Sequence, residues 1–492
     1  MKLAWPAART AGRTCLLGLV VAAYGCNELP TEVSPTVEPQ MAATMAANST
    51  IDLKVVRFTG GTGSVLVSSG IPLAPGLLRQ GQSGQVRLLV SGVEQPVHIK
   101  ELKGFHVDGS LRSILLQFKY AVPTGGMNAQ LVIGQSRTKT ALPLGPATYP
   151  YGKPLPAAAA LPSSPAYLIS TGIVGRGTLA PDGFNPTYET NFSTYGDPKW
   201  SKFYSKYGTS ITVSDANNFN YYDRAYIYYA WWVRTGNPEY WRRAAYYEAA
   251  YRDRYIRAVN YNLQPHNLHI DGIEAHYLLT GDTASFTAVR KIAHSYYGLW
   301  MSHIGSLTSK YNANRIQARV LDTYMTAARL DIRHHDYHAA SRKALTLILG
   351  TQRSDGSYRF ITSCQEQLNF MTGLLNDALV EYYEVIAPDP RIPTAIRRSL
   401  DFLWNTQWLP ASGGFKYISG YCSKQGTTKP APDLNMLIVS PFGWYAKHSG
   451  LSGYRTKGDQ VFIEGVKRAW LVGEKHFNQN YRASYRYLFY RR

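Results

Sequence analysis

The pattern of apolar and polar residues changes along the chain, and its first part is typical of β-strands. Runs of six to ten residues alternate in polarity or stay apolar between turns rich in Gly and Ser. They predict an all-β domain over residues 51–144, and residues 145–215, rich in Pro, Gly, Ser and Tyr without a regular period, are expected to form an irregular interdomain segment. The predicted strands are 52–58, 85–90, 97–102 and 111–120.

From residue 217 the apolar residues follow the period of a helix, and the helices come in pairs. In each of the first two pairs, a short turn joins the two helices: Thr-Gly-Asn at 235–237 in the first pair and Thr-Gly-Asp at 280–282 in the second. Repeated pairs predict an (α/α) toroid of five to six helical hairpins over 216–492, with a sixth pair either missing or hidden before Asp215. The predicted pairs are 220–235 with 240–258, 268–279 with 284–305, 315–330 with 337–350, 365–386 with 394–407, and 434–448 with 461–477.

The short turns lie within each pair, so the longer loops between pairs gather at one end, where the first helix of each pair begins. Clefts are commonly built from such loops on a rigid scaffold. We therefore expect a cleft at this end and call it the rim. The residues predicted to bind substrate there are Asn267, Arg315, Arg319, Tyr358, Arg359, Glu366 and Asn369.

The stretch 264–282, QPHNLHIDGIEAHYLLTGD, contains the strongest candidate chemistry. It places His266, His269 and Asp271 at the rim, whereas His276 lies two turns deeper and is expected to be hydrogen-bonded in the core. A polar helix start whose His residues only cap and hydrogen-bond is the alternative.

Net charge and aromatic content favour an anionic carbohydrate as the partner. The chain has 52 Lys+Arg against 32 Asp+Glu, for a formal charge of +20, and such a field attracts polyanions. Its 37 Tyr and 10 Trp are suited to stacking on sugar rings. Because the basic residues are spread along helices without a nucleic-acid motif, an acidic polysaccharide is expected rather than a nucleic acid.

The first residues indicate export. A basic start is followed by the short apolar run CLLGLVVAAY and then by Cys26, so residues 1–25 are predicted to be a signal peptide. The motif Ala-Tyr-Gly-Cys at 23–26 resembles a bacterial lipobox and implies lipidation of Cys26, although Tyr24 departs from the usual small residue and ordinary cleavage is the alternative. Residues 26–50 would form a flexible tether. An outer-membrane lipoprotein or a periplasmic protein is expected, anchored to the membrane by lipid.

The remaining cysteines, Cys364 and Cys422, follow equivalent segments of neighbouring repeats and are predicted to form a disulfide, with two buried free thiols as the alternative. No Cys/His zinc spacing occurs, and a polar helix turn is favoured over a metal site for the His residues at 334, 335 and 338. No cofactor is expected, with a bound divalent cation as the alternative. The protein is expected to be a monomer.

Two parts of the chain resemble known carbohydrate-active proteins. The β domain is similar, in segments 70–78, 86–89, 95–99 and 107–118, to the N-terminal RIFT barrel of exo-acting rhamnogalacturonan lyase-like proteins, although Ala74, Val107 and Ser113 depart from that pattern. Residues 221–236 and 276–282 resemble toroid domains of polysaccharide lyase-like bacterial proteins. The resemblance implies a RIFT-like barrel followed by a toroid, a multidomain β + α protein that acts on polysaccharide.

β-Elimination on a uronic acid needs a cation to neutralise the carboxylate, a base for the C5 proton and an acid for the leaving oxygen. Asn267 with Arg315 or Arg319 could neutralise, His266 or His269 could be the base, and Tyr222 or Tyr277 the acid. A hydrolase needs two opposed carboxyl groups. Asp223, Asp271, Glu274 and Glu366 are its candidates. A polysaccharide lyase is favoured, and a glycoside hydrolase, a non-catalytic glycan-binding lipoprotein and a structural envelope protein are the alternatives.

Overall fold

An eight-stranded sheet opens the part of the chain that is described in the computed structural model, which covers residues 49–492 except 154, 302–312, 359–366 and 420–428. The strand order is β4-β3-β7-β1-β8-β2-β6-β5, and neighbouring strands are antiparallel apart from β2 and β8. The strands are β1 (Ser49–Arg57), β2 (Val65–Pro72), β3 (Val86–Val90), β4 (Val93–Gln95), β5 (His98–Glu101), β6 (Ser113–Tyr120), β7 (Met127–Ile133) and β8 (Ala158–Pro162).

The predicted strands correspond to β1, β3, β5 and β6, and four further strands complete the sheet. In the described part of the chain, no ladder joins the end strands β4 and β5, so the strands form an open sheet where a barrel was expected. In β1 the residues Ile51, Leu53 and Val55 are buried and alternate with exposed ones, as the period of two requires.

Strand β6 is buried on both faces because one side packs within the sheet and the other against a helix. Ile114, Leu116 and Phe118 belong to the sheet core. On the other face, Ser113 donates from its hydroxyl to the carbonyl of Leu278 at 2.5 Å, which joins β6 to helix α6 (Ile270–Thr280). The sheet and the helices belong to one compact unit.

The segment 145–215, which the sequence predicted to be irregular, contains β8 and helices as well. They are α1 (Pro165–Ser170), α2 (Pro186–Tyr207) and the start of α3 (Val213–Asn220). Helix α2 begins with Asn185 as its cap and Pro186 in its first turn, as a helix should. Pro198 and Gly196 inside it obscured the helical pattern.

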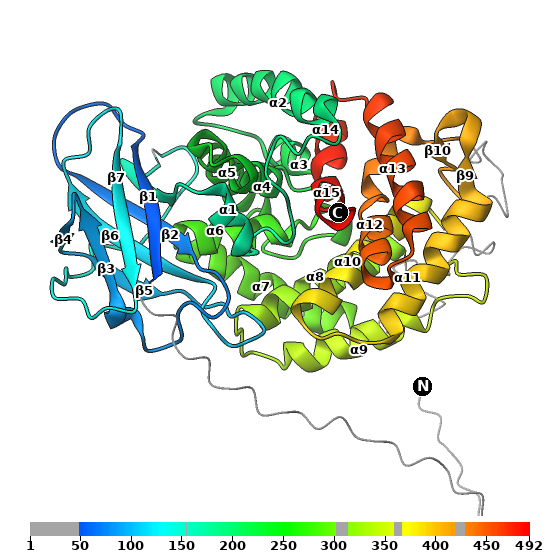
Figure 1. Ribbon diagram of the computed structural model, residues 1–492, viewed down its shortest axis with the longest axis horizontal. Coiled ribbons are helices and arrows are strands. Elements are labelled where there is room, and N and C mark those ends of the chain that lie inside the picture. Colours follow the sequence, from blue (N-terminus) through cyan, green and yellow to red (C-terminus); the bar gives the residue numbers. More distant parts are fainter. Residues whose placement is uncertain (1–48, 154, 302–312, 359–366, 420–428) are drawn as a thin grey trace, which may run out of the picture. The chain divides into compact units, whose positions relative to one another are not determined.

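The five predicted helical pairs are all present, in the green to orange-red part of Figure 1. Gly236 and Gly281 end the first helices of two pairs with φ of 69° and 75°, a conformation that glycine adopts without strain. The pairs are α4 (Arg224–Thr235) with α5 (Pro238–Ala250), α6 with α7 (Thr283–Trp300), α8 (Asn314–Arg329) with α9 (Tyr337–Leu349), α10 (Asn369–Val385) with α11 (Arg391–Phe402), and α12 (Ser440–Ser449) with α13 (Ser452–Lys467).

A sixth group of helices closes the circle of contacts. The first helices of successive pairs touch in the order α4, α6, α8, α10 and α12, after which α12 packs on α15 (Ser484–Tyr490) and α14 (Glu474–Tyr481) packs on α4. Helix α2 contacts α14. The sixth group therefore combines helices that are far apart in the sequence. Helix α2 lies before Asp215, and α14 and α15 lie near the C-terminus. A short ribbon of β9 (Trp408–Leu409) and β10 (Gly414–Phe415) lies between α11 and α12 in the sequence.

The predicted signal peptide and the lipidated Cys26 lie outside the described residues, as do Cys364 and Cys422. The predicted tether also lies outside them, except for Ser49 and Thr50, which begin β1. Within the described residues, none of the helices combines the length and the apolar character needed to span a bilayer.

Gly70 of β2 allows the sheet to approach α6 closely, and substituting it should weaken the fold. A Cβ at this position would lie 2.1 Å from the carbonyl oxygen of Leu278. We expect Gly70→Ala to lower the free energy of unfolding by about 1–3 kcal/mol, measured by urea denaturation. Gly84→Ala is the control, because a Cβ at that position would have no neighbouring atom within 4 Å. Equal stability of the two variants would contradict a close packing of sheet and helix.

Candidate functional site

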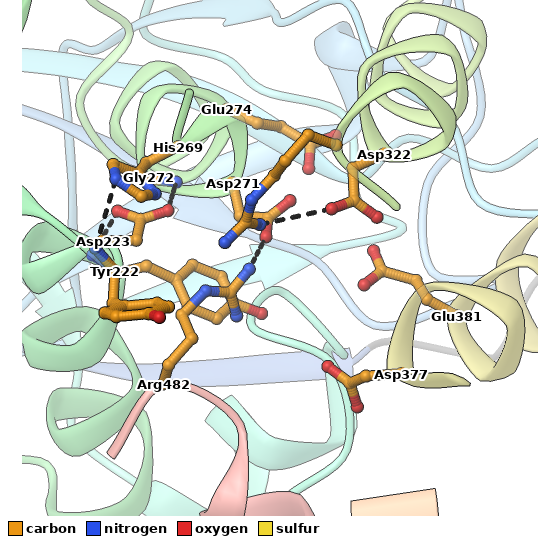
Figure 2. Close-up of polar contacts among 12 residues, drawn as sticks. Tyr222, Asp223, His269, Asp271, Gly272, Glu274, Asp322, Asp377, Glu381 and Arg482 are labelled. Atoms are coloured by element: carbon orange, nitrogen blue, oxygen red, sulfur yellow. Dashed lines mark hydrogen bonds and ion pairs between the residues drawn. The ribbon is translucent and has the colours of Figure 1, made fainter. Parts of the chain in front are cut away.

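The starts of α4 and α6 are held together by Asp223. Its Oδ1 caps α4 by accepting from the backbone N–H of Tyr226 at 3.2 Å, and its Oδ2 accepts from the N–H of Gly272 at 2.9 Å. Tyr222 and Asp223 both have a left-handed backbone, with φ of 66° and 65°. Gly272 is required here because a Cβ would lie 2.2 Å from Asp223 Oδ1. The carboxylate of Asp223 thus positions two of the central helices (Figure 2).

His269 is buried beside this junction, and its Nε2 accepts from the backbone N–H of Tyr222 at 3.1 Å. The neutral ring therefore carries its proton on Nδ1. Burial, together with the guanidinium groups of Arg319 and Arg482, holds the pKa of His269 well below its usual range. Because its accepting nitrogen is already used, His269 is poorly placed to take a proton from a substrate.

Arg482, from the C-terminal helices, pairs with Asp271 and also acts electrostatically on Asp223. Arg482 donates from Nη2 to Asp271 Oδ2, and Figure 2 shows it reaching from the red helix toward Asp271. Burial raises the pKa of Asp223 to about 7, with Arg482 opposing the rise and Asp271 adding to it. A protonatable carboxyl therefore lies near one that is paired with a guanidinium.

A network of buried ion pairs continues along the central helices. Arg319 pairs with Asp322 at 3.3 Å, and Arg486 contacts Asp377 at 3.3 Å and Glu381 at 3.4 Å. Burial raises the pKa values of Asp322 and Asp377 above the usual range. Figure 2 shows Asp322, Glu381 and Asp377 close to one another in the interior. Arg319 is committed to Asp322 by the ion pair between them.

Glu274 links this network to the sheet. Its Oε1 lies 2.6 Å from Arg112 of the sheet domain, and its Oε2 lies 2.7 Å from Arg329 of α8. Arg329 also contacts Glu381 at 3.1 Å. Burial opposes ionisation of Glu381, but Arg486 and Arg329 outweigh it and lower its pKa to about 2. Glu274 thus braces basic residues, and its role is structural.

Nearer the solvent, His266, Arg315, Tyr221 and Lys475 form a cationic group that we call the rim cluster. Arg315 Nη1 donates to the hydroxyl of Tyr221 at 3.1 Å, and Lys475 Nζ lies 5.4 Å from the centroid of the Tyr221 ring. His266 is exposed. Partial burial and the charge of Arg315 lower the pKa of His266, so its imidazole is neutral at neutral pH.

The other predicted binding residues face elsewhere. Asn267 donates to the hydroxyl of Tyr255 at 2.9 Å, and Asn369 donates to the carbonyl of Lys416 at 2.8 Å. Tyr358 is fully buried. These three support local structure and do not join the rim cluster, whereas Arg359 and Glu366 lie outside the described residues.

His276 lies in the core, as the sequence predicted, and Tyr277, which was a candidate acid, is buried there as well. His276 is fully buried, with Nδ1 2.9 Å from the hydroxyl of Ser285, and the Tyr277 hydroxyl accepts from the N–H of Lys103 at 2.8 Å. Across the described residues, no three His, Cys, Asp or Glu side chains are grouped so as to hold a metal ion.

Sequence reasoning missed Arg482, Arg486, Arg112, Tyr221 and Lys475. Arg482 and Arg486 are four residues apart in an aromatic tail, and this spacing of two basic residues was the available signal. Arg482 directly follows α14, and Arg486 lies in α15. Arg112 gave no such signal, because its partner Glu274 is 162 residues away.

The sequence matches no protein-family model and no curated protein. Among solved structures, it is similar to an unsaturated glucuronyl hydrolase specific for heparin, with 11% identity, a TM-score of 0.43, and coverage of 57% of this chain and 85% of that one. It is also similar to an unsaturated glucuronyl hydrolase from Bacillus sp. GL1, responsible for the degradation of glycosaminoglycan, with 11% identity, a TM-score of 0.40, and coverage of 52% of this chain and 74% of that one. A polysaccharide lyase is similar as well, with 11% identity, a TM-score of 0.42, and coverage of 62% of this chain and 98% of that one. Similarity at this level does not assign an activity.

Removing the partner of Asp271 should destabilise the protein strongly. Arg482→Met keeps most of the side-chain volume but leaves the buried carboxylate unpaired, so we expect a loss of about 3–5 kcal/mol in the free energy of unfolding. Arg468→Met is the control, because that exposed arginine pairs with Glu464 at the surface. Chemical denaturation at neutral pH measures both. A loss no larger than the control's would contradict the role given to Arg482.

The raised pKa of Asp223 predicts a pH-dependent stability. An acid whose folded pKa lies above its unfolded value of about 3.8 contributes stability at low pH that is lost as pH rises through about 7. Asp223→Asn removes this titration. Relative to wild type, the variant should gain up to about 1.4 kcal/mol per pH unit between about pH 4 and 7. Urea denaturation across that range tests it, and a constant difference between the two proteins would refute the assignment.

Proposed function

We propose that this protein is an enzyme that acts on an acidic polysaccharide by β-elimination at the rim cluster. The observation that carries the proposal is the arrangement around Arg315, which donates to the hydroxyl of Tyr221 and, together with partial burial, lowers the pKa of His266. A cation, a neutral imidazole and a phenol hydroxyl are thereby gathered near solvent. These are the three groups that the elimination of a uronate requires.

In the proposed reaction, Arg315, assisted by Lys475, binds the uronate carboxylate and stabilises the negative charge that develops when the C5 proton leaves. His266 takes that proton. The C–O bond to the leaving sugar then breaks as the double bond forms, and the Tyr221 hydroxyl donates its proton to the departing oxygen. Tyr221 replaces Tyr222 in this role, because Tyr222 is 2% exposed and Tyr221 is only half-buried.

Glycoside hydrolysis is the second candidate, and the raised pKa of Asp223 next to Asp271 favours it. One carboxyl with a pKa of about 7 beside one that is paired with a guanidinium could act as an acid and base pair. Both carboxyl groups are buried, however, and both oxygens of Asp223 already accept backbone N–H groups. For this reason the rim cluster is preferred.

The proposal includes the wider organisation of the chain. We assign the closed circle of helices to an (α/α) toroid and the sheet to a RIFT-like domain, with the boundary between them in 145–215. We also propose an exported, monomeric lipoprotein anchored through Cys26 after removal of residues 1–25, with a disulfide between Cys364 and Cys422.

The test is incubation of the purified protein with a panel of uronate polymers. Lyase activity would appear as rising ultraviolet absorbance of an unsaturated product. New reducing ends without that absorbance would favour the hydrolase, and binding without either would favour a glycan-binding protein.

His266→Ala should lower the rate of elimination by about a hundredfold or more, as loss of a general base does. His338→Ala is the control, because His338 is also exposed but lies on α9. Since the pKa of His266 is lowered, the rate should stay high down to about pH 6.5 and fall only as pH drops further. A rate unchanged in His266→Ala would exclude His266 as the base.

A further inference from the structure

A pocket of about 440 Å³ lies beside α7, away from the rim cluster. It is lined chiefly by exposed residues of α7, by the connection that precedes α6 and by the turn between α8 and α9. We call it the α7 pocket, and its principal lining residues are Asn260, Tyr261, Arg290, Lys291, His294 and His334.

The α7 pocket is lined by bases and, among the described residues, by no carboxylate. Lys291 Nζ lies 4.4 Å from the centroid of the Tyr261 ring. Two acidic residues near the α8–α9 turn are committed elsewhere: Asp331 pairs with Arg333 at 2.8 Å, and Asp336 caps α9 by accepting from the N–H of Ala339 at 2.8 Å. The positive charge in the pocket is therefore available to a ligand.

His294 is positioned by a hydrogen bond to the ring of His335. Its Nδ1 lies 3.0 Å from Nε2 of His335, and the two rings are parallel within 5° with centroids 5.2 Å apart. His335 in turn stacks on Tyr297, with centroids 3.8 Å apart. Nearly coplanar rings at this spacing place the N–H of one ring in line with the lone pair of the other, which is a hydrogen bond and not two ligands converging on a metal. The bond uses Nδ1 of His294 and leaves Nε2 for a ligand.

The α7 pocket and the rim cluster lie on the same connection between helices. Tyr261 lines the pocket, and His266 belongs to the rim cluster. Five residues of extended chain span at most about 18 Å, which bounds the separation of their Cα atoms. A single oligosaccharide of a few sugars can cover such a distance.

We infer that the α7 pocket is a second binding site for the same acidic polysaccharide, which holds carboxylate or sulfate groups of the chain while another part occupies the rim cluster. This inference rests on the proposed function for the identity of the polymer. It adds a site for long substrates that short ones do not reach. Arg290 and Lys291 supply positive charge, and His294 presents its Nε2 to the ligand.

The pH dependence follows from the groups around His294. His335 and His334 face it from the α8–α9 turn, Arg290 and Lys291 flank it on α7, and Tyr261 lies on the third element. Burial and the two neighbouring His residues lower the pKa of His335. Because imidazoles take up protons as pH falls through about 6.5, binding of an anionic polymer to a pocket lined by them should strengthen.

The test measures affinity by electrophoresis of the full chain through native gels that contain polygalacturonate, dextran sulfate or neutral dextran. Arg290→Ala/Lys291→Ala should weaken binding to one or both anionic polymers by about three- to tenfold, as the loss of two exposed ion pairs would. The control variant Lys202→Ala/Lys206→Ala removes the same charge from exposed positions on α2 and should change affinity less than about twofold. The two anionic gels distinguish carboxylate from sulfate recognition.

Further arms separate this inference from the proposed reaction. His294→Gln should reduce the gain in affinity between about pH 7.5 and 5.5, whereas His338→Gln should keep it. The variant Arg290→Ala/Lys291→Ala should retain the wild-type rate on a uronate trisaccharide and have a lower rate on polymer at low concentration.

If the wild type cleaves no polymer but Arg290→Ala/Lys291→Ala still loses affinity, the proposed elimination is wrong and the inferred binding site is retained. Equal affinity of pocket and control variants, no binding of either anionic polymer, or an equal loss for a DNA oligonucleotide would overturn the inference.

Discussion

The ion pair between Arg482 and Asp271 is the interaction on which the rest of the helical structure depends. An ionised carboxylate in a protein interior is costly unless a cation and hydrogen bonds offset its loss of water. Arg482 follows Asp271 by 211 residues, so the first turn of α6 is electrostatically complete only when the C-terminal helices have docked. The interior charges therefore favour closure of the whole circle of helices over any partial one.

The same requirement joins the sheet to the helices. Glu274 needs Arg112 from the sheet domain as well as Arg329 from α8, and without the sheet it would lose one of its two partners. The close approach at Gly70 and the hydrogen bond from Ser113 add steric and polar contacts along the same face of α6. Charge pairing thus selects the partner surfaces, and the small residues of β2 and β6 allow them to meet.

The parts of this structure that follow from local chemistry were predictable from the sequence, and those that need distant partners were not. Gly281 ends one helix, and Asp282 Oδ1 caps the next by accepting from the N–H of Ala284. Both are local features, so the turn and its helical pair could be predicted. His266 was placed at the rim by the order of long and short loops. The partners of Asp271 and Glu274 were not predictable, because nothing in a sequence specifies which distant guanidinium meets a given carboxylate. Helix α2 shows a third case, in which a proline inside the helix masked a clear start signal at Asn185.

In the proposed reaction, the placement of charge would let one arginine serve both binding and catalysis. Interior carboxylates are paired with arginines or protonated through burial, so they do little to offset the cations that face solvent at the rim. Arg315 would attract a uronate, while partial burial and the charge of Arg315 lower the pKa of His266 and make it a weaker base. A bound carboxylate would cancel much of that charge, and the pKa of His266 would then rise toward its ordinary value of about 6.5. The base would therefore gain strength when the substrate that it must deprotonate is in place.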